Sequence, residues 1–430
     1  MSACTKLFSP LTPRLQTLSL RSRRTLATVS TLSSPAKQKV IVISGPTGSG
    51  KSRLSLELAK RLNGEIICAD SVTVYQGLDV GSAKPSPCDQ AEVTHHLLDI
   101  LHPSEDYSAG DFYRDARAAT ELVLHKGRVP IVTGGTGLYL RWYLYGKPGV
   151  PKGTLEGAAA VWAEMEDIQR KGDWYEGVEH VVQAGDPSAR ALPVNDWYRL
   201  RRKLEIIRSA GTPPSAFPIP YDEFRKNDPS TDLDVKDLDY DFICIFLTMP
   251  RVELYRSIDL RCEEMVRNPD GLLSEASWLL DIGLKPNMNS ATRAIGYRQA
   301  MTYLSNCRKG GGKSSAEYFY DFLSTFQKAS RNFAKRQMVW FRSEKTYMWV
   351  DASKNFDEIV GFVCDCYHGR VGKEVPKDLE IRKESGGKEE SKKMKLYRTQ
   401  NKYFVKHEDF DDVLSWIETT QGHFATLVEV

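Results

Sequence analysis

Gly45-Pro46-Thr47-Gly48-Ser49-Gly50-Lys51-Ser52 is the stretch of sequence that decides the fold. It follows the apolar run Val40–Ile43 and precedes Leu54–Ala59, so the order is strand, glycine-rich turn and helix. The stretch matches G-x-x-x-x-G-K-[S/T], in which backbone N–H groups surround phosphate oxygens at the start of a helix. Lys51 adds a positive charge, and Ser52 offers a hydroxyl to Mg²⁺. We interpret the stretch as a phosphate-binding loop, with a turn that binds nothing as the alternative, and it does not reveal which phosphate compound it holds.

The composition is that of a globular protein with room for two or three domains. The chain has 430 residues, is 41% hydrophobic and has a net charge of +3. A nucleic-acid surface would therefore be a local patch. No apolar run reaches membrane-spanning length, so we expect no membrane contact. Eight scattered cysteines argue against a disulfide framework, and Cys364, Cys366 and His368 lack the usual zinc spacing.

The first residues, 1 to about 37, are basic and rich in Ser and Thr, and the first carboxylate of the chain is Glu57. This composition resembles an organellar transit peptide, and a disordered basic tail is the alternative. We expect a plastid or mitochondrial location, between which these residues do not decide, and a cytosolic location is less favoured.

Strands and helices alternate from Lys39 onward, which predicts an α/β fold with a parallel, P-loop NTPase-like sheet. A helix is expected from Gly50 to Leu62. Strands are expected at Val40–Ser44, Glu65–Ala69, Val129–Thr133 and Phe242–Thr248. Ligands of open parallel sheets gather at the carboxyl ends of the strands. This rule places Asp70 and Ser71, the Gly134–Gly137 turn and the phosphate loop on one edge.

About a hundred residues without strong strand signals separate two of these strands, too many for a loop. We expect an inserted helical domain at 151–234, between core segments 38–150 and 235–350. It contains the basic helical run Asp196–Arg208, whose arginines would suit a polyanion. A solvated helix with surface salt bridges is the alternative.

After residue 250 the sequence is mainly helical. Helices are expected at 251–267, 270–282, 290–303 and 316–340, the last with a basic stripe formed by Lys328, Arg331, Lys335, Arg336 and Gln337. Tyr347–Val350 is expected as an edge strand. The C-terminal extension, 351–430, contains a Lys/Glu-rich stretch at 373–396 that reads as a flexible linker, and a short helix is expected near its end.

Polar residues follow the second expected strand directly. A carboxylate at that position, Asp70, suits Mg²⁺ binding or proton abstraction, and capping of the local backbone is the alternative. Lys84 would neutralise phosphate or be an ordinary surface lysine. Thr136 would donate to a leaving-group oxygen or stabilise its own turn.

Taken in order from about residue 40 to 343, these motifs resemble the tRNA dimethylallyltransferases, of the bacterial or organellar type. No motif beyond the phosphate loop is specific by itself, but their order is. They are the phosphate loop, Asp70-Ser71 with Tyr75, Asp79–Pro85, His96–Asp99, Tyr107–Ala109 with Phe112, Gly134–Thr136 with Leu138 and Tyr139, Asn195-Asp196 with Arg199 and Arg202, Arg293–Gln299, and Ala334–Gln337 with Trp340.

The resemblance implies transfer of a dimethylallyl group from dimethylallyl diphosphate to N6 of adenosine 37, in tRNAs that read codons starting with U. The loop would then hold the diphosphate of this donor and not ATP. Asp70 would be the general base, and Thr136 would bind the bridging oxygen of the diphosphate. Lys51, with Arg261 or Arg293 or both, and Mg²⁺ near Ser52 would neutralise the leaving diphosphate.

The resemblance also implies that the adenine leaves its stack and that the inserted domain grips the anticodon stem-loop, with adenosines at positions 36 to 38. The implied tRNA contacts are Asp70, Ser71, Val72, Thr73, Arg199, Arg202, Arg293, Gly296, Tyr297, Arg298, Lys335 and Arg336. We expect a monomer. A C-terminal Cys₂His₂ zinc finger, found in cytosolic relatives, is not evident in this sequence.

Three other functions stay open at this point. One is an adenylate isopentenyltransferase that prenylates free AMP, ADP or ATP for cytokinin biosynthesis. The second is a small-molecule kinase that consumes ATP, and the third is a tRNA-binding protein without catalysis.

Overall fold

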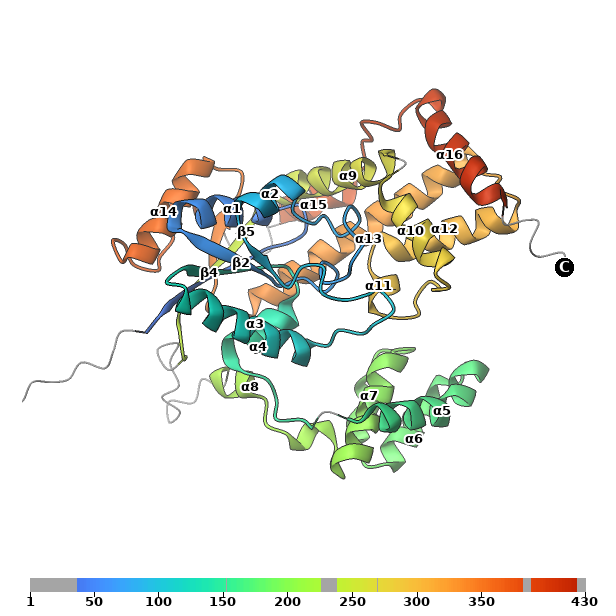
Figure 1. Ribbon diagram of the computed structural model, residues 1–430, viewed down its shortest axis with the longest axis horizontal. Helices are drawn as coiled ribbons and strands as arrows, with labels where there is room; N and C mark the ends of the chain where they lie inside the picture. The colour runs from blue at the N-terminus through green and yellow to red at the C-terminus, as the bar shows by residue number, and fades with distance from the viewer. Residues whose placement is uncertain (1–36, 152, 226–237, 269, 382–387, 424–430) are drawn as a thin grey trace, which may run out of the picture. The chain divides into compact units, whose positions relative to one another are not determined.

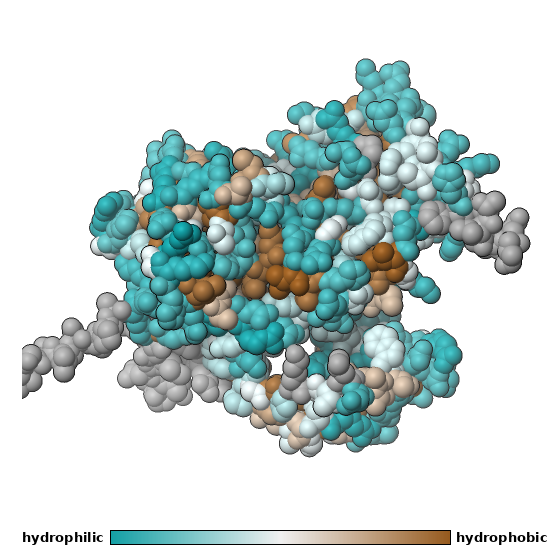
Figure 2. Space-filling model, in the orientation of Figure 1, coloured by the Kyte–Doolittle hydropathy of each residue, from teal (hydrophilic) through white to brown (hydrophobic). Residues whose placement is uncertain are grey.

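The computed structural model describes residues 37–151, 153–225, 238–268, 270–381 and 388–423. The expected transit peptide at 1–37 therefore lies outside the described residues, apart from Lys37. Among the described residues, no helix has the length and apolar character needed to cross a membrane. Figure 2 shows a mostly hydrophilic surface with apolar residues gathered in a few patches.

A six-stranded parallel sheet forms the centre of the fold, which confirms the predicted α/β class. Its spatial order is β3-β2-β4-β1-β5-β6. The strands are β1 (Lys39–Ser44), β2 (Gly64–Cys68), β3 (His95–His96), β4 (Val129–Thr133), β5 (Asp241–Thr248) and β6 (Met348–Asp351). Thr133 is in register with both Ile43 and Cys68, so the carboxyl ends of β1, β2 and β4 meet at one edge.

Helices cover both faces of the sheet, as Figure 1 shows. Successive side chains of a strand point to opposite faces, and both faces of β1 are apolar. Ile41 and Ile43 pack with α1 (Lys51–Leu62) and α14 (Phe356–His368). Val40 and Val42 belong to the other core, with α3 (Ala109–His125) and α4 (Gly137–Tyr145). A helix α2 (Pro87–Glu92) precedes β3.

Between α4 and β5, three helices form a hydrophobic core of their own. They are α5 (Leu155–Lys171), α6 (Trp174–Gln183) and α7 (Trp197–Ala210), whereas Tyr221 of the following α8 (Pro220–Arg225) packs in the core of the sheet. Met165, Trp174 and Leu200 are buried together in this core. The ends of α7 follow the sequence signals, because Asp196 accepts the N–H of Arg199 at its start and Gly211, with φ of +69°, ends it.

A helical layer follows β5 and supplies one wall of the site. It consists of α9 (Arg251–Arg267), α10 (Leu272–Asp281), α11 (Ser290–Arg293), α12 (Tyr297–Lys309) and α13 (Ala316–Arg342). The helix expected at 290–303 is therefore two helices, and the single-helix prediction is wrong. Gly296 separates them with φ of +96°, and a Cβ atom there would lie 3.1 Å from the ring of Phe326.

The expected basic stripe of α13 is divided between two faces. Lys328, Lys335 and Arg336 are exposed. Arg331 pairs with the buried Asp259, and Gln337 is itself buried. A pattern of charges along a helix does not reveal which of them meets a buried carboxylate.

The stretch expected to be a flexible linker, 373–396, is ordered in its described parts. Leu379 is buried, and Glu380 forms an antiparallel bridge with Val350 at the edge of the sheet. The stretch ends in α15 (Lys388–Leu396), which packs against α9. These contacts attach the polar stretch to the sheet and to α9, and residues 382–387 lie outside the described part. A last helix, α16 (Asp411–Gln421), packs on α12.

Candidate functional site

The phosphate loop has the backbone geometry that its glycines allow. Gly48 and Gly50 have φ of +80° and +87°, and a Cβ atom on Gly45 would lie 2.1 Å from the carbonyl oxygen of Leu247. Lys51 is the first residue of α1, and its Nζ donates to the carbonyl of Pro46 at 2.9 Å. The lysine is thus folded back over the loop.

Lys51, Asp70 and Arg261 lie within electrostatic reach of one another. Burial and, to a smaller extent, the charge of Arg261 lower the pKa of Lys51 from its ordinary 10.5 to about 7, and Asp70 opposes the shift. Burial also lowers the pKa of Arg261, which Asp70 again opposes. Two cations that are held together with little solvent favour an anionic ligand between them.

Asp70 follows the end of β2 by one residue, Ala69. The N–H of Ala69 donates to the carbonyl of Thr133 at 2.7 Å, which attaches this part of the chain to β4. The Oδ1 atom of Asp70 accepts the N–H of Val72 at 2.9 Å, so the capping role considered for Asp70 is present. Within the described part of the chain, the hydrogen bond of this carboxylate is made by Oδ1, and Oδ2 makes none. One oxygen orients the carboxylate and the other is available.

Gln337 of α13 joins the phosphate loop to the Gly134–Gly137 turn. Its Oε1 accepts the N–H of Thr47 at 3.0 Å, and its Nε2 donates to the carbonyl of Gly135 at 3.0 Å. A Cβ atom on Gly135 would lie 2.2 Å from this Nε2, so a larger residue there would displace the Gln337 side chain. The sequence drew attention to Gln337 as part of the basic stripe and of the motif Ala334–Gln337, neither of which indicates this role.

Thr136 occupies the N-cap position of α4 but makes no capping hydrogen bond. Its hydroxyl therefore does not stabilise the turn in the usual way. The residue is half-buried beside Gly135, on the same edge of the sheet as the phosphate loop.

Two cavities adjoin at Asp70. One, of about 390 Å³, is built on the phosphate loop and will be called the loop cavity; Lys51, Ser52 and Gly134 line it. The other, of about 610 Å³, will be called the outer cavity; Ser71 and Tyr139 are among its lining residues. Both cavities share Thr47, Asp70, Ser82, Arg261 and Phe333. A ligand in one cavity can therefore meet a ligand in the other at Asp70.

The two candidate arginines occupy different places. Arg261, on α9, lines both cavities and acts electrostatically on Lys51. Arg293, at the end of α11, lines the outer cavity, with its guanidinium 5.0 Å from the ring centre of Tyr198. Of the two, Arg261 is the neighbour of the phosphate loop. Tyr198 is exposed on α7 and also lines the outer cavity, which no sequence pattern indicated.

The residues expected to contact tRNA lie in several different places. Those that line the outer cavity are Asp70, Ser71, Val72, Arg293, Arg298 and Arg336. Lys335 is exposed on α13, and Thr73 is buried and lines the loop cavity. Arg199 and Arg202 are exposed or half-buried on α7, in ion pairs with Asp196 at 3.2 Å and Glu205 at 2.8 Å, so the salt bridges of the alternative interpretation are present.

Gly296 and Tyr297 are buried and line neither cavity, and the expectation that they contact tRNA stays a prediction. Tyr297 is fully buried, and its hydroxyl donates to Glu275 at 2.7 Å. Its tyrosine ring fills the core behind the loop at 75–85 instead of facing solvent. The sequence did not reveal that Tyr297 is buried while its neighbour Arg298 is exposed.

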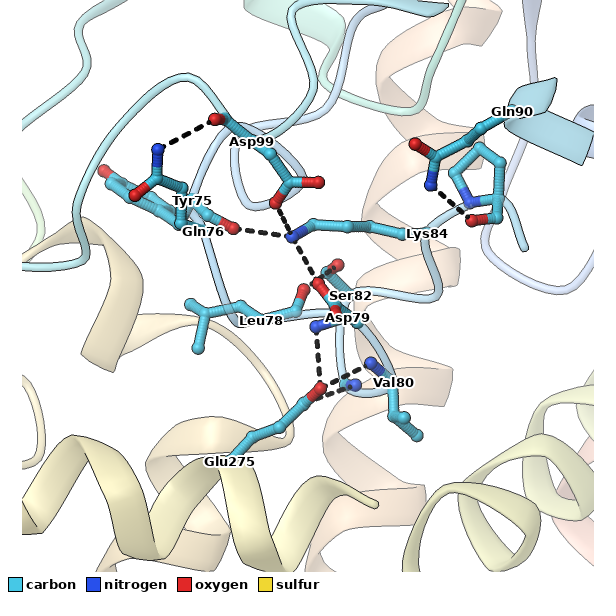
Figure 3. Close-up of polar contacts among 12 residues, drawn as sticks. Tyr75, Gln76, Leu78, Asp79, Val80, Ser82, Lys84, Gln90, Asp99 and Glu275 are labelled. Atoms are coloured by element: carbon cyan, nitrogen blue, oxygen red, sulfur yellow. Dashed lines mark hydrogen bonds and ion pairs between the residues drawn. The ribbon is translucent and has the colours of Figure 1, made fainter. Parts of the chain in front are cut away.

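Two charged side chains shape the loop at 75–85 (Figure 3). Lys84 is 3% exposed and donates to the carbonyl of Tyr75 at 2.7 Å and to the carboxylates of Asp79 and Asp99. It is therefore neither a phosphate ligand nor a surface lysine. Glu275 accepts the N–H groups of Asp79, Val80 and Gly81 at 2.7 to 2.9 Å. This network holds the segment that carries Ser82 to the boundary of both cavities.

The site has the donor set that Mg²⁺ accepts beside a diphosphate. The described residues contain no cluster of three or more His, Cys, Asp or Glu side chains that could hold a metal ion alone. Mg²⁺ commonly binds through one or two protein oxygens together with phosphate oxygens and water. Ser52 and Asp70 supply such oxygens to the loop cavity.

Comparison with known proteins gives matches across the whole site. The family described as IPP transferase matches residues 73–344, and the one described as Isopentenyl transferase matches residues 38–99. The tRNA dimethylallyltransferase 9 of Arabidopsis thaliana is 58% identical over 400 residues, 89% of this chain and 86% of the relative. The tRNA dimethylallyltransferase of Protochlamydia amoebophila is 38% identical over 325 residues, 75% of this chain and 87% of the relative.

Solved structures resemble the chain as well. The full-length tRNA isopentenylpyrophosphate transferase from Bacillus halodurans is 30% identical with a TM-score of 0.52, and the likeness covers 78% of this chain and 98% of that one. A eukaryotic dimethylallyltransferase acting on tRNA has a TM-score of 0.60 at 24% identity, over 79% of this chain and 82% of that one. The second likeness concerns the fold alone.

Proposed function

Because the chain belongs to the IPP transferase family, we propose that it is a tRNA dimethylallyltransferase, which moves a dimethylallyl group from its diphosphate to N6 of an adenosine in tRNA. The observation that carries the proposal is the meeting of two cavities at Asp70, one of them built on a phosphate loop. A reaction that joins a diphosphate ester to a large second substrate needs such an arrangement.

The loop cavity would take the diphosphate of the donor. Lys51 and Arg261 would neutralise its charge, and the hydroxyl of Thr136 would bind the bridging oxygen, with charge stabilisation greatest as the diphosphate leaves. When bound at Ser52 and the phosphate oxygens, Mg²⁺ would supply further positive charge at this point. Arg293 would instead serve the acceptor, because it lines the outer cavity.

The outer cavity would take the adenine, unstacked from its loop. The N6 lone pair attacks C1 of the donor, the bond between C1 and the bridging oxygen breaks, and diphosphate departs with that electron pair. Asp70 removes the proton from N6. An exocyclic amine conjugated to a purine is a weak nucleophile, so a general base is worth about 10²–10⁴ in rate.

The finer assignments are part of the proposal. The acceptor would be adenosine 37, with adenosines 36 and 38 beside it, in tRNAs that read codons starting with U. We also propose that the protein acts as a monomer and that residues 1–37 direct it to a plastid or mitochondrion. Prenylation of free AMP, ADP or ATP is not favoured, since the Isopentenyl transferase match stops at residue 99.

The test uses the purified full chain with Mg²⁺ and labelled dimethylallyl diphosphate. A tRNA with adenosines at 36 to 38 competes with free AMP for the label. We expect N6-dimethylallyladenosine at position 37 of the tRNA, found by nucleoside analysis, and no label in AMP. Label in AMP alone would reject the proposal.

A further inference from the structure

Two buried carboxylates flank Arg261 on α9. Asp259 and Glu263 are 1% and 0% exposed. They stand two residues before and two residues after the arginine, so both lie on the face of the helix opposite to it. We propose that residues 397–404, which we call the C-terminal strap, position Arg261 through these two carboxylates and thereby set the rate of the chemical step.

Glu263 is held by the backbone of the strap. Its carboxylate accepts the N–H groups of Lys402 at 2.9 Å, Tyr403 at 2.7 Å and Phe404 at 3.2 Å. In the described part of the chain these three consecutive amides are its hydrogen-bond partners. A fully buried carboxylate is costly without such bonds, so α9 keeps this position only while the strap is docked.

Asp259 joins the strap to both helices. Its Oδ2 accepts the hydroxyl of Tyr397 at 2.7 Å, and its Oδ1 pairs with Arg331 of α13. Arg331 also donates to the hydroxyl of Thr399 at 3.0 Å. One buried carboxylate therefore fixes α9, α13 and the strap relative to one another.

A further bond and an aromatic cluster extend this attachment. Gln327 of α13 donates to Asn401 of the strap at 3.0 Å. The ring of Phe404 lies 5.1 Å from that of Phe319 at the far end of the strap. The strap is therefore bound along the groove between α9 and α13 and not at a single point.

The opposite faces of these two helices carry the site. Arg261 of α9 and Phe333 of α13 line the cavities, and Gln337 of α13 binds the phosphate loop. None of the strap residues is among the lining residues of either cavity. The strap is thus a positioning element that touches no substrate.

The strap lies beyond residue 344, where the IPP transferase match ends, whereas Arg261 lies within the match. In this inference, a segment outside the family match therefore holds in place a residue inside it. This inference rests on the proposed function for its main readout, the kcat of transfer to tRNA. Its second readout, the binding of inorganic diphosphate, does not depend on transferase activity.

The test compares Glu263→Gln and Tyr397→Phe with the wild-type chain in steady-state transfer to tRNA, with single-turnover measurements to isolate the chemical step. A glutamine amide offers donors where three N–H groups need an acceptor, so α9 should shift. Displacement of a group by a fraction of an ångström costs a large factor in rate, and we expect kcat to fall about tenfold for Glu263→Gln and less for Tyr397→Phe. The KM for tRNA should stay unchanged.

A double-mutant cycle separates positioning from loss of stability. If the strap acts through Arg261, Glu263→Gln should have no further effect on kcat in an Arg261→Ala background. Additive effects, or wild-type kcat in both strap variants, would overturn the inference. Tyr397→Phe keeps the test open should Glu263→Gln fail to fold.

The matched control is Glu65→Gln. Glu65 is 1% exposed and pairs with His96, Lys126 and Arg128 at the start of β2, the end of the sheet away from the site. The Glu65→Gln variant should lower the Tm without changing kcat.

Binding of inorganic diphosphate gives the second readout, since Glu263→Gln should weaken this binding several-fold. A wild-type chain without transferase activity would reject the proposed function, and unchanged diphosphate binding in Glu263→Gln would reject the strap separately.

Discussion

Lys51 is the residue whose chemistry the fold changes most clearly. With a pKa of about 7 in place of 10.5, it is half neutral near physiological pH in the free protein. A diphosphate beside it favours the charged form, so binding should take up a proton between pH 7 and 10.5. We expect the affinity for inorganic diphosphate to fall as pH rises above about 7, measured by calorimetry in buffers with different ionisation enthalpies.

The matched variant is Lys51→Arg, which keeps its charge throughout this range and should show no such proton uptake. The stability of the free protein follows the same linkage. Below pH 7 the lysine is charged in both states and its burial is unfavourable; between pH 7 and 10.5 the unfolded state binds more protons, so stability rises with pH. A diphosphate affinity that does not change with pH would contradict this account.

Asp70 has one oxygen that orients it and one that is available for a proton. Asp70→Asn keeps the hydrogen bond to the N–H of Val72 through the amide oxygen, so the local backbone should persist. We expect binding of diphosphate and tRNA to be retained while turnover falls by about 10²–10⁴. Weak binding with normal turnover would instead make Asp70 a ligand residue.

At the scale of an element, α7 is the candidate tRNA surface. Arg199 and Arg202 are now paired with carboxylates of their own helix, and such surface pairs are weak, so a phosphate can replace the partner. Arg199→Ala and Arg202→Ala should each weaken tRNA binding and reduce its salt dependence by about one unit of slope.

Arg370→Ala is the control for α7. Arg370 is about as exposed as Arg199 and pairs with Asp365, but it follows α14, outside the inserted helices. Titrations of tRNA binding against salt concentration should separate it from the α7 variants. A slope that Arg199→Ala and Arg202→Ala leave unchanged would exclude α7 from the tRNA interface.

At the scale of the whole molecule, the inserted helices have a core separate from the core of the sheet. Trp174 is 5% exposed in this core and lies edge-on to Trp197, the first residue of α7. Trp174→Ala should cost about 3–5 kcal/mol within the insert, which is enough to unfold a small helical unit locally.

We expect that variant to lose tRNA binding and to keep the affinity of the loop cavity for inorganic diphosphate. Hydrogen exchange would show protection lost in α5, α6 and α7 and retained in β1 and α1. Loss of diphosphate affinity would mean that the two cores unfold together as one cooperative unit.

The sequence by itself determined the parallel sheet, the phosphate loop and the carboxylate after β2. These features depend on local rules: strand and helix periodicity, glycines with positive φ, and the meeting of strand ends at one edge. The linear order of motifs was also sufficient to indicate the family.

The tertiary structure alone decided which charged residue faces which partner. Arg261 lies beside the phosphate loop while Arg293 faces Tyr198, and Lys84 is buried among carboxylates. The polar stretch after 373 was expected to be a flexible linker. In the structure it leads into the C-terminal strap, which binds two buried carboxylates. Burial and pairing depend on segments far apart in the chain, and no local pattern contains that information.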